Sequence, residues 1–431
     1  MFREGLLDKT LRAIKRFIPK RIFSLGAKVY HPLLAWTGAL RYGFPSRKLR
    51  IIGVTGTKGK STVVYMTAKL LEGAEHPVAA IGSLGYKIRE REWPNMLKMT
   101  MPGRWKIQKF LREAVAAGCT HVVMEVPSEG LAQGRHVGVR FDCAVFTNMH
   151  PEHIEAHGGF ENYRTAKGML FATTKHLHVL NADDVEAHYF ASFRAQKKLF
   201  YGIHGGELRA SELDVHEDRA SFHVYGTQFN LQLGGAFNVY NALAALSVGA
   251  LYGIDLPTAK PTLEAIMEIP GRMQWIQKQP FGVVVDYAHT PESLEQVYQT
   301  LRNQKSNIKN QKLICVLGAA GGGRDKWKRK KFGALAERYC DRIILTNEDP
   351  YDENPVAIVE DIAAGITGPL QKKVERIMDR RAAIAEALTD AHEGDIVIIT
   401  GKGSETSMAL AGGKKIPWSD AQTVKDLLKG R

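Results

Sequence analysis

The sequence reads Gly53-Val-Thr-Gly-Thr-Lys-Gly-Lys-Ser-Thr62 where an apolar run, Leu49–Thr55, gives way to a helical pattern from about Lys60 to Leu71. A strand, a glycine-rich turn and a helix in this order are typical of a phosphate-binding loop, because backbone N–H groups and the helix N-terminus attract phosphate oxygens. The strict G-x4-G-K-[S/T] pattern fails only at Val54. We expect Lys60 to neutralise the β- and γ-phosphates and Ser61 to ligate Mg²⁺. The predicted nucleotide-binding residues of this segment are Gly56, Thr57, Lys58, Gly59, Lys60, Ser61 and Thr62.

Strands and helices are expected to alternate on both sides of a break near Pro270–Gly271. Alternation of this kind predicts a mostly parallel sheet with helices on its faces. Residues 207–235 differ, because short alternating runs separated by turn residues indicate an antiparallel patch. The strands expected before and after the break are His121–Val126, Cys143–Thr147, His178–Asn181, Val283–Asp286, Leu313–Leu317, Arg342–Leu345 and Asp395–Thr400.

These patterns predict an α/β protein of three parts. Residues 1–49 form a basic amphipathic helical segment, residues 50–270 a central P-loop ATP-binding domain with a mostly parallel sheet, and residues 271–431 a C-terminal, Rossmann-like doubly wound domain. A length of 431 residues agrees with two or three domains.

Charge and cysteine usage exclude several classes of protein. The formal charge is +14, but residues 1–50 hold 12 basic and two acidic residues, so the remaining chain carries only about +4. We therefore expect no nucleic-acid partner. The four cysteines are far apart, which excludes a zinc ribbon and favours a reducing compartment. Because no apolar run is long enough to span a bilayer and no secretory signal is present, a cytoplasmic location is expected.

The first 49 residues leave two interpretations open. Apolar residues such as Phe2, Leu6 and Leu11 recur at helical spacing, with Lys and Arg between them. One interpretation is a helix that packs on the body of the protein with a solvated basic face. The other is an interfacial helix in peripheral contact with an acidic membrane, at the inner face of the cell membrane.

Four further segments carry a family resemblance. They are Met124-Glu-Val-Pro-Ser-Glu-Gly-Leu131, Phe146-Thr-Asn-Met-His-Pro-Glu-His-Ile-Glu-Ala-His-Gly158, Asp286-Tyr-Ala-His-Thr-Pro291 and Gly401-Lys-Gly-Ser-Glu405. Together with the phosphate loop they resemble the Mur ligase family, and within it the MurE-like type that adds the third residue of the peptidoglycan stem. The resemblance extends from about residue 50 to the C-terminus and implies an ATP-dependent ligase that joins an amino acid to a carboxylate through an acyl-phosphate.

The resemblance implies roles for residues around ATP and two Mg²⁺ ions. Catalytic roles are implied for Lys60, Lys167, His153 and Arg272, and Lys167 corresponds to a lysine that is carbamylated in the family. The implied metal ligands are Ser61, Glu125, His153 and Lys167. Beyond the phosphate loop, nucleotide contacts are implied for Asn148, Asn238, Arg272, Asp286 and His289.

The resemblance also implies a substrate site. An acceptor peptide would contact Thr100, Met101, Pro102, Ser128 and Arg135, and Arg324 and Asp325 belong to a loop that contacts nucleotide and acceptor. The incoming amino acid would contact Glu348, Asp349, Pro350, Tyr351, Gly401 and Glu405. The motifs depart from the family at Pro127, Glu129, Glu152, Glu155 and Ser404.

The amino acid is predicted from charge. Tyr351 stands where the diaminopimelate-adding type has an arginine, and Asp349 stands where it has an asparagine. A pocket that loses a cation and gains an anion should prefer a terminal ammonium, so we expect lysine, ornithine or another diamino acid.

Only about 50 residues precede the phosphate loop, whereas family members usually carry a UDP-gripping domain there. The expected acceptor is a UDP-MurNAc-peptide in peptidoglycan precursor synthesis. Two alternatives stay open: an amide ligase for a lipid-linked or free peptide or a glutamyl polymer, and a nucleotide-binding subunit without turnover.

Overall fold

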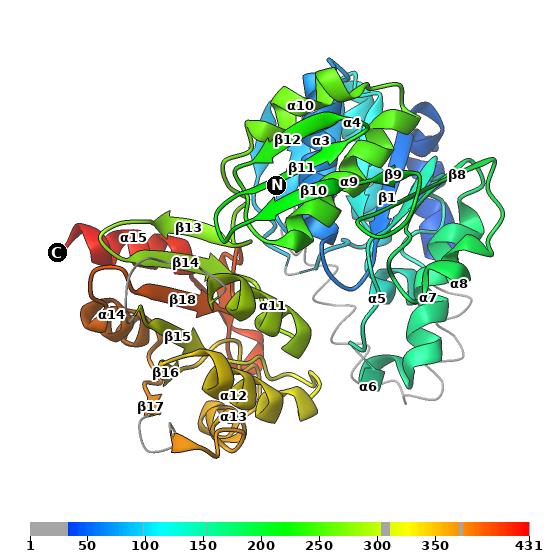
Figure 1. Cartoon of the computed structure of the whole chain (residues 1–431). Helices are drawn as coiled ribbons and strands as arrows, with labels where there is room; N and C mark the ends of the chain where they lie inside the picture. The colour runs from blue at the N-terminus through cyan, green and yellow to red at the C-terminus, as the bar shows by residue number, and fades with distance from the viewer. Residues whose placement is uncertain (1–32, 98, 153, 303–310, 370–373, 431) are drawn as a thin grey trace.

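The computed structural model describes residues 33–97, 99–152, 154–302, 311–369 and 374–430. It has two lobes, each built on a sheet (Figure 1). The first lobe contains a nine-stranded sheet in the order β4-β3-β2-β5-β1-β6-β7-β8-β9. Its strands are β1 (Arg50–Thr55), β2 (Val78–Gly82), β3 (Gly85–Ile88), β4 (Arg91–Trp93), β5 (His121–Glu125), β6 (Cys143–Phe146), β7 (Leu177–Asn181), β8 (Lys197–Gly202) and β9 (Leu208–Arg209). All neighbours pair in parallel except β2 with β3 and β3 with β4.

Helices cover both faces of this sheet, so its central strands are buried on two sides. In β1, Ile52 and Val54 belong to one hydrophobic cluster and Ile51 to the other, as the two-residue period of a strand requires. Helices of the first cluster are α3 (Lys60–Gly73), α9 (Ala236–Leu251) and α10 (Leu256–Glu264). Helices of the second side are α4 (Arg104–Ala116), α5 (Ser128–Ala132), α6 (Ile154–His157), α7 (Phe160–Thr173) and α8 (Ala187–Ala191).

A small sheet of β10 (Ser211–Val215), β11 (Ala220–Val224) and β12 (Thr227–Leu231) is antiparallel, which confirms the prediction for residues 207–235. Its buried residues, Phe222 and Phe229 among them, join the cluster around α3 and α9. The turn at residues 214–217 lies on the wall of the cavity described below.

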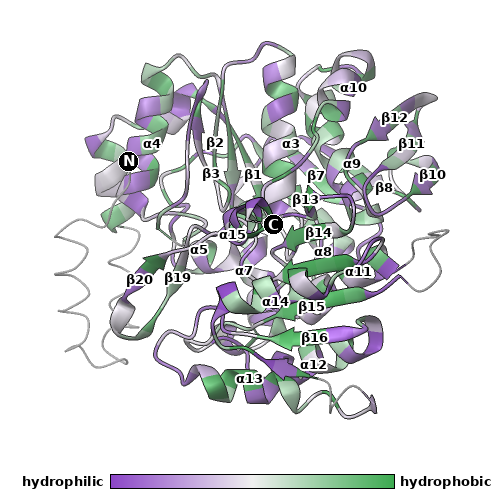
Figure 2. Cartoon of the chain, turned by 90° about the vertical axis from the view of Figure 1, so that its left-hand side faces the viewer, coloured by the Kyte–Doolittle hydropathy of each residue, from purple (hydrophilic) through white to green (hydrophobic). Residues whose placement is uncertain are grey.

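The second lobe has a six-stranded sheet in the order β13-β14-β18-β15-β16-β17. Only β13 is antiparallel to its neighbour. The strands are β13 (Gln274–Gln277), β14 (Gly282–Asp286), β15 (Leu313–Leu317), β16 (Arg342–Leu345), β17 (Glu375–Arg376) and β18 (Ile396–Thr400), and a hairpin of β19 (Ser407–Ala409) and β20 (Lys415–Pro417) follows. Figure 2 shows the apolar character of β14, β15 and β16.

Helices also cover both faces of the second sheet. They are α11 (Pro291–Arg302), α12 (Trp327–Tyr339) and α13 (Pro355–Ala363) with one cluster, and α14 (Arg380–Asp390) and α15 (Asp420–Lys429) with the other. The predicted α/β class, with a parallel P-loop sheet and a doubly wound second sheet, is confirmed. The predicted N-terminal helices lie mostly outside the described residues; a helix at residues 33–41 and a 3₁₀ turn, η1 (Pro45–Lys48), are described. Among described residues, no helix has the length and apolar character needed to cross a bilayer.

Candidate functional site

A cavity of about 950 Å³ is lined by residues of both lobes. In the first lobe β1 lies between β5 and β6, so the carboxyl ends of these three strands meet at one edge. Open parallel sheets bind ligands at this edge. In the second lobe, the carboxyl end of β14 contributes Asp286 and the loop after it. The cavity therefore joins the strand ends of the two sheets.

The phosphate loop is shaped by close backbone approach. Gly56 and Gly59 have φ of +151° and +80°, and a Cβ atom would collide with Thr147 Oγ1 at Gly56 and with Asn241 Oδ1 at Gly59. Only glycine, which lacks a Cβ atom and adopts a positive φ without strain, fits at these two positions. Lys60 Nζ donates to the Thr57 carbonyl at 2.8 Å. Every residue from Gly56 to Thr62, the segment predicted to bind nucleotide, lines the cavity.

A carboxylate stands beside the first turn of α3. Glu125, at the end of β5, is buried, and its Oε2 accepts hydrogen bonds from Ser61 Oγ at 3.1 Å and from the Ser83 N–H at 2.9 Å. Arg272, from the second lobe, donates to Ser61 Oγ at 3.2 Å and stacks over the Tyr287 ring at 4.4 Å. The structure thus brings three of the predicted residues, Ser61, Glu125 and Arg272, into one contact set.

Lys167 lies beneath the phosphate loop rather than on the exposed face of a helix. It is buried in α7, donates to the Gly56 carbonyl at 2.7 Å and lies 4.5 Å from the centroid of the Tyr163 ring. Burial, together with the charge of Lys60, lowers the pKa of Lys167 well below its usual value. A neutral amine at this position is therefore favoured.

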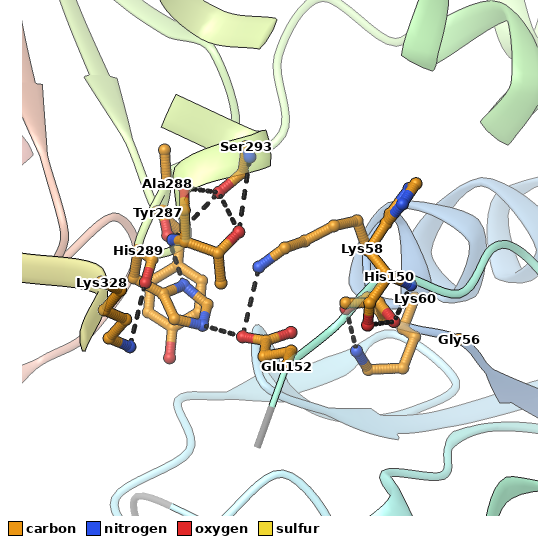
Figure 3. A network of polar contacts seen from close by, with 12 residues as sticks. Gly56, Lys58, Lys60, His150, Glu152, Tyr287, Ala288, His289, Ser293 and Lys328 are labelled. Atoms are coloured by element: carbon orange, nitrogen blue, oxygen red, sulfur yellow. Dashed lines mark hydrogen bonds and ion pairs between the residues drawn. The ribbon is translucent and has the colours of Figure 1, made fainter. Parts of the chain in front are cut away.

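A buried carboxylate connects the two lobes at the cavity (Figure 3). Glu152 Oε1 accepts from Lys58 Nζ at 3.4 Å and pairs with His289 Nε2 at 3.2 Å, and Figure 3 shows both side chains pointing toward it. His289 Nδ1 lies 2.7 Å from the Tyr287 carbonyl. Burial, together with the charge of Lys58, lowers the pKa of His289 to about 3, so the neutral ring donates through only one of its two nitrogens. Glu152 is therefore the counter-charge of Lys58 and a contact of His289 in the other lobe.

The predicted acceptor residues lie together, with one exception. Thr100, Met101, Ser128 and Arg135 line the cavity, whereas Pro102 lies outside its lining. Thr100 Oγ1 shares a 2.9 Å hydrogen bond with Ser83 Oγ, and Arg135 donates to the Met101 carbonyl. Ser83 also contacts Glu125, so the acceptor side is linked to the phosphate loop.

The predicted nucleotide residues outside the loop also line the cavity: Asn148, Asn238, Arg272, Asp286 and His289. The Asn148 side chain accepts from the Lys58 N–H at 2.8 Å. Asp286 is buried and accepts from the Met273 and Ala288 N–H groups, both at 2.6 Å. Burial raises the pKa of Asp286. In this structure Asp286 thus shapes the turn that carries His289.

Of the residues predicted to contact the incoming amino acid, and of the loop beside them, Arg324, Tyr351 and Glu405 line the cavity. Arg324 lies close enough to Tyr351 to interact with it electrostatically. The remaining predicted residues lie outside the lining: Asp325, Glu348, Asp349, Pro350 and Gly401.

The predicted charge of the amino-acid pocket needs correction. Asp349 is buried, and its Oδ1 accepts from Lys402 Nζ at 2.9 Å and from the Ala409 N–H at 2.7 Å. Lys402 also donates to Glu405 and to the Ser407 carbonyl. The negative charge of Asp349 is therefore already paired, and Arg324 supplies a cation beside Tyr351. The pocket does not simply exchange a cation for an anion.

His153 lies outside the described residues, so its predicted metal role stays a prediction. Within the described ranges, no group of three or more His, Cys, Asp or Glu is placed to hold a metal. Sequence reasoning missed the roles of Glu152, Asn241 and Lys402 as contact residues. Glu152 and Lys402 stand inside motifs quoted above, and Asn241 lies three residues after Asn238, so these motifs were the signal from which their roles could have been predicted.

Family models and proteins of known sequence match this chain over most of its length. The Mur ligase middle domain model matches residues 54–249, and the Mur ligase, glutamate ligase domain model matches residues 271–403. The UDP-N-acetylmuramyl-tripeptide synthetase of Roseiflexus sp. (strain RS-1) is 37% identical over 420 residues, covering 92% of this chain and 81% of that protein. The UDP-N-acetylmuramoyl-L-alanyl-D-glutamate–2,6-diaminopimelate ligase of Bacillus velezensis is 36% identical over 395 residues, covering 88% and 78%.

Solved structures agree with these matches. A structure of a UDP-N-acetylmuramoyl-L-alanyl-D-glutamate–2,6-diaminopimelate ligase superposes with a TM-score of 0.60 at 32% identity, covering 89% of this chain and 78% of that one. Folylpolyglutamate synthase of Mycobacterium tuberculosis shares the fold, with a TM-score of 0.71 at 19% identity and coverage of 86% and 92%. The resemblance predicted from the motifs is confirmed: the chain belongs to the Mur ligase family.

Proposed function

We propose that this protein adds a diamino acid to the peptide carboxylate of a UDP-MurNAc-peptide during peptidoglycan precursor synthesis in the cytoplasm. As a Mur ligase it is an ATP-dependent, ADP-forming amide ligase. One observation carries the proposal: a single cavity is lined by the phosphate loop, by the predicted acceptor residues Thr100 and Arg135, and by Arg324 and Glu405 from the other lobe. Three reactants can therefore meet in one enclosed space.

In the first step, the acceptor carboxylate would take the γ-phosphoryl group of ATP, which gives an acyl-phosphate and ADP. We propose that Lys60 and Arg272 stabilise the charge that develops on the transferring group, and that Arg135 exchanges its Gln133 partner for an acceptor carboxylate. Positioning supplies most of the remaining acceleration. Because water would hydrolyse the acyl-phosphate, contact between the lobes at Ser61 and Arg272 also serves to exclude it.

The residues around Ser61 fit a magnesium ion. The Ser61 hydroxyl and the Glu125 carboxylate supply the oxygen ligands that a hard cation prefers, and they lie 3.1 Å apart. We propose His153 and a carbamylated Lys167 as partners for a second ion. Bound Mg²⁺ would neutralise charge on the phosphates.

A carbamate on Lys167 requires a neutral amine that can react with CO₂. The lowered pKa of Lys167 supports this modification. The carbamate would replace a buried neutral amine by an anion next to Lys60, whose charge would then be paired.

In the second step, the amine of the incoming amino acid would attack the acyl carbon, and phosphate would leave as the amide forms. Glu405, which lines the cavity, would bind the α-ammonium group. We propose lysine or ornithine as the amino acid, supported by Tyr351 at the position of a carboxylate-binding arginine. Diaminopimelate, which appears in the names of several relatives, is the competitor, and Arg324 beside Tyr351 is the feature that favours it.

The test is phosphate release from ATP and Mg²⁺ with UDP-MurNAc-L-Ala-D-Glu as acceptor and one amino acid at a time. Release that requires both the acceptor and lysine or ornithine, with a product of the matching mass, would support the whole proposal. Stimulation by diaminopimelate alone would refute the amino-acid assignment. Tight ATP binding without turnover for any amino acid would favour a different acceptor, lipid-linked or free, or a subunit without turnover.

A further inference from the structure

The helix at residues 33–41 presents its large apolar side chains to solvent. Leu33, Trp36 and Leu40 are 60%, 52% and 70% exposed, whereas the small residues Ala35 and Ala39 are fully buried. Spacing of three and four residues places the exposed side chains on one face of the helix. Surface helices of soluble domains normally bury their large apolar residues, so this reversed pattern indicates a face that is covered by a partner.

The helix is held on the body of the protein, which fixes the direction of that face. Trp105 of α4 donates from its indole Nε1 to the Leu34 carbonyl at 3.1 Å, and its ring lies 6.3 Å from that of Tyr42. Trp105 is itself 42% exposed. We call Leu33, Trp36 and Leu40 the apolar face.

Basic residues flank the apolar face in the sequence and are frequent on helix α4, which contacts this segment. Residues 33–48 contain Arg41, Arg47 and Lys48 and no acidic residue. Helix α4 adds four basic residues against one acidic residue, Glu113. Residues 1–32, outside the described part of the chain, contribute eight Lys or Arg against two acidic residues to the sequence that leads into the helix. A tryptophan-bearing apolar surface flanked by basic residues is complementary to a bilayer of anionic lipid.

We propose that the apolar face docks on the surface of an anionic lipid bilayer, with the flanking Lys and Arg residues in contact with the headgroups. The helix lies on the membrane and does not cross it. None of the residues of the apolar face lines the cavity. The inference therefore goes beyond the ligase reaction, and it can be tested independently of the proposed activity.

The test uses the full chain and vesicles of phosphatidylcholine with or without phosphatidylglycerol. We expect binding only with phosphatidylglycerol, and binding that weakens as salt rises. The triple variant Leu33→Ser, Trp36→Ser, Leu40→Ser should bind these vesicles at least about tenfold less tightly. A matched control carries Val185→Ser, Tyr225→Ser and Met267→Ser, which removes exposed apolar residues elsewhere, and should bind like the unmodified protein. Both variants should keep ATP-dependent phosphate release.

Tryptophan fluorescence gives a second measurement. Brominated phosphatidylglycerol should quench the unmodified protein more than a Trp36→Phe variant. The proposal is overturned if the triple variant binds as tightly as the unmodified protein, or if the phosphatidylglycerol preference is absent. It is also overturned if iodide fails to quench Trp36 without lipid, which would mean that the chain's own residues 1–32 cover the face. A dimer in solution that the triple variant dissociates would assign the face to a second copy instead.

Discussion

Replacing Lys402 with methionine should destabilise the second lobe strongly. The Lys402 side chain is fully buried, and Asp349 beside it is 3% exposed, so neither charge has access to water. Removing one member of a buried ion pair typically costs about 3–5 kcal/mol, because the other charge stays buried without a counter-charge. For a unit of this size, that loss corresponds to a fall of roughly 6–20 °C in the melting temperature.

The assay is chemical and thermal denaturation of three variants. Lys402→Met should show the full loss. The double variant Lys402→Met, Asp349→Asn should regain most of it, since the asparagine oxygen still accepts from the Ala409 N–H and Glu405, the other acidic partner of Lys402, is partly exposed to water. Lys415→Met, at an exposed position of β20, is the matched control and should change the free energy of unfolding by less than about 0.5 kcal/mol. A loss below about 1 kcal/mol for Lys402→Met, or a double variant no better than the single one, would refute the assignment of Asp349 to a structural ion pair.

Three further predictions concern the site and its surroundings. Glu152→Gln removes the negative charge between Lys58 and His289 and should raise the KM for ATP at least about tenfold. The control Glu155→Gln, at an exposed position, should leave the KM for ATP unchanged, and equal effects of the two variants would contradict this prediction. Burial raises the pKa of Glu348 to about 7 from 4.5, so the folded protein binds the proton of this group more tightly than the unfolded chain does. The resulting stabilisation of the folded state, about 3 kcal/mol, is complete below pH 4.5 and is lost as the pH rises through 7. Glu348→Gln should flatten the dependence of unfolding free energy on pH in that window, and an unchanged slope would rule out this group. Arg272→Lys keeps the charge but loses the forked contact to Ser61 and the Gly271 carbonyl; kcat should fall roughly hundredfold, and a near-normal kcat would exclude transition-state contact.

The parts of the fold that were predictable depend on local patterns. The strand, glycine turn and helix around Gly53–Thr62 could be predicted because the apolar strand, the glycines of the turn and the start of the helix are all encoded by neighbouring residues. Most buried strands of both sheets were readable as short apolar runs, since helices cover both of their faces, although the mostly buried β2 was not predicted. The edge strands β4 and β13, and β3 beside β4, are partly exposed and have no continuous apolar run, and they were not predicted either.

The site was predictable in its membership but not in its contacts. Asp349 and Lys402 are 53 residues apart in the sequence, and the pairing of β15 with both β16 and β18 brings their loops together. A charge argument made from Asp349 and Tyr351 alone therefore could not include Lys402 or Arg324. Long-range pairing of this kind decides whether an acidic residue faces a ligand or supports a loop.

The contacts of the phosphate loop also bear on how nucleotide would bind. Lys60 and Lys167 both donate to backbone carbonyls of the loop itself, those of Thr57 and Gly56. A phosphate oxygen is a stronger acceptor for an ammonium group than a carbonyl oxygen is, because both partners are charged. An arriving nucleotide can thus replace the Thr57 carbonyl as the partner of Lys60 without rearrangement of β1 or α3. Lys58 differs, since its partner Glu152 is charged and also contacts His289. Exchange at Lys58 would remove the cation that pairs with Glu152 within the first lobe. Because Glu152 also contacts His289 of the second lobe, phosphate binding and lobe contact are coupled through Glu152.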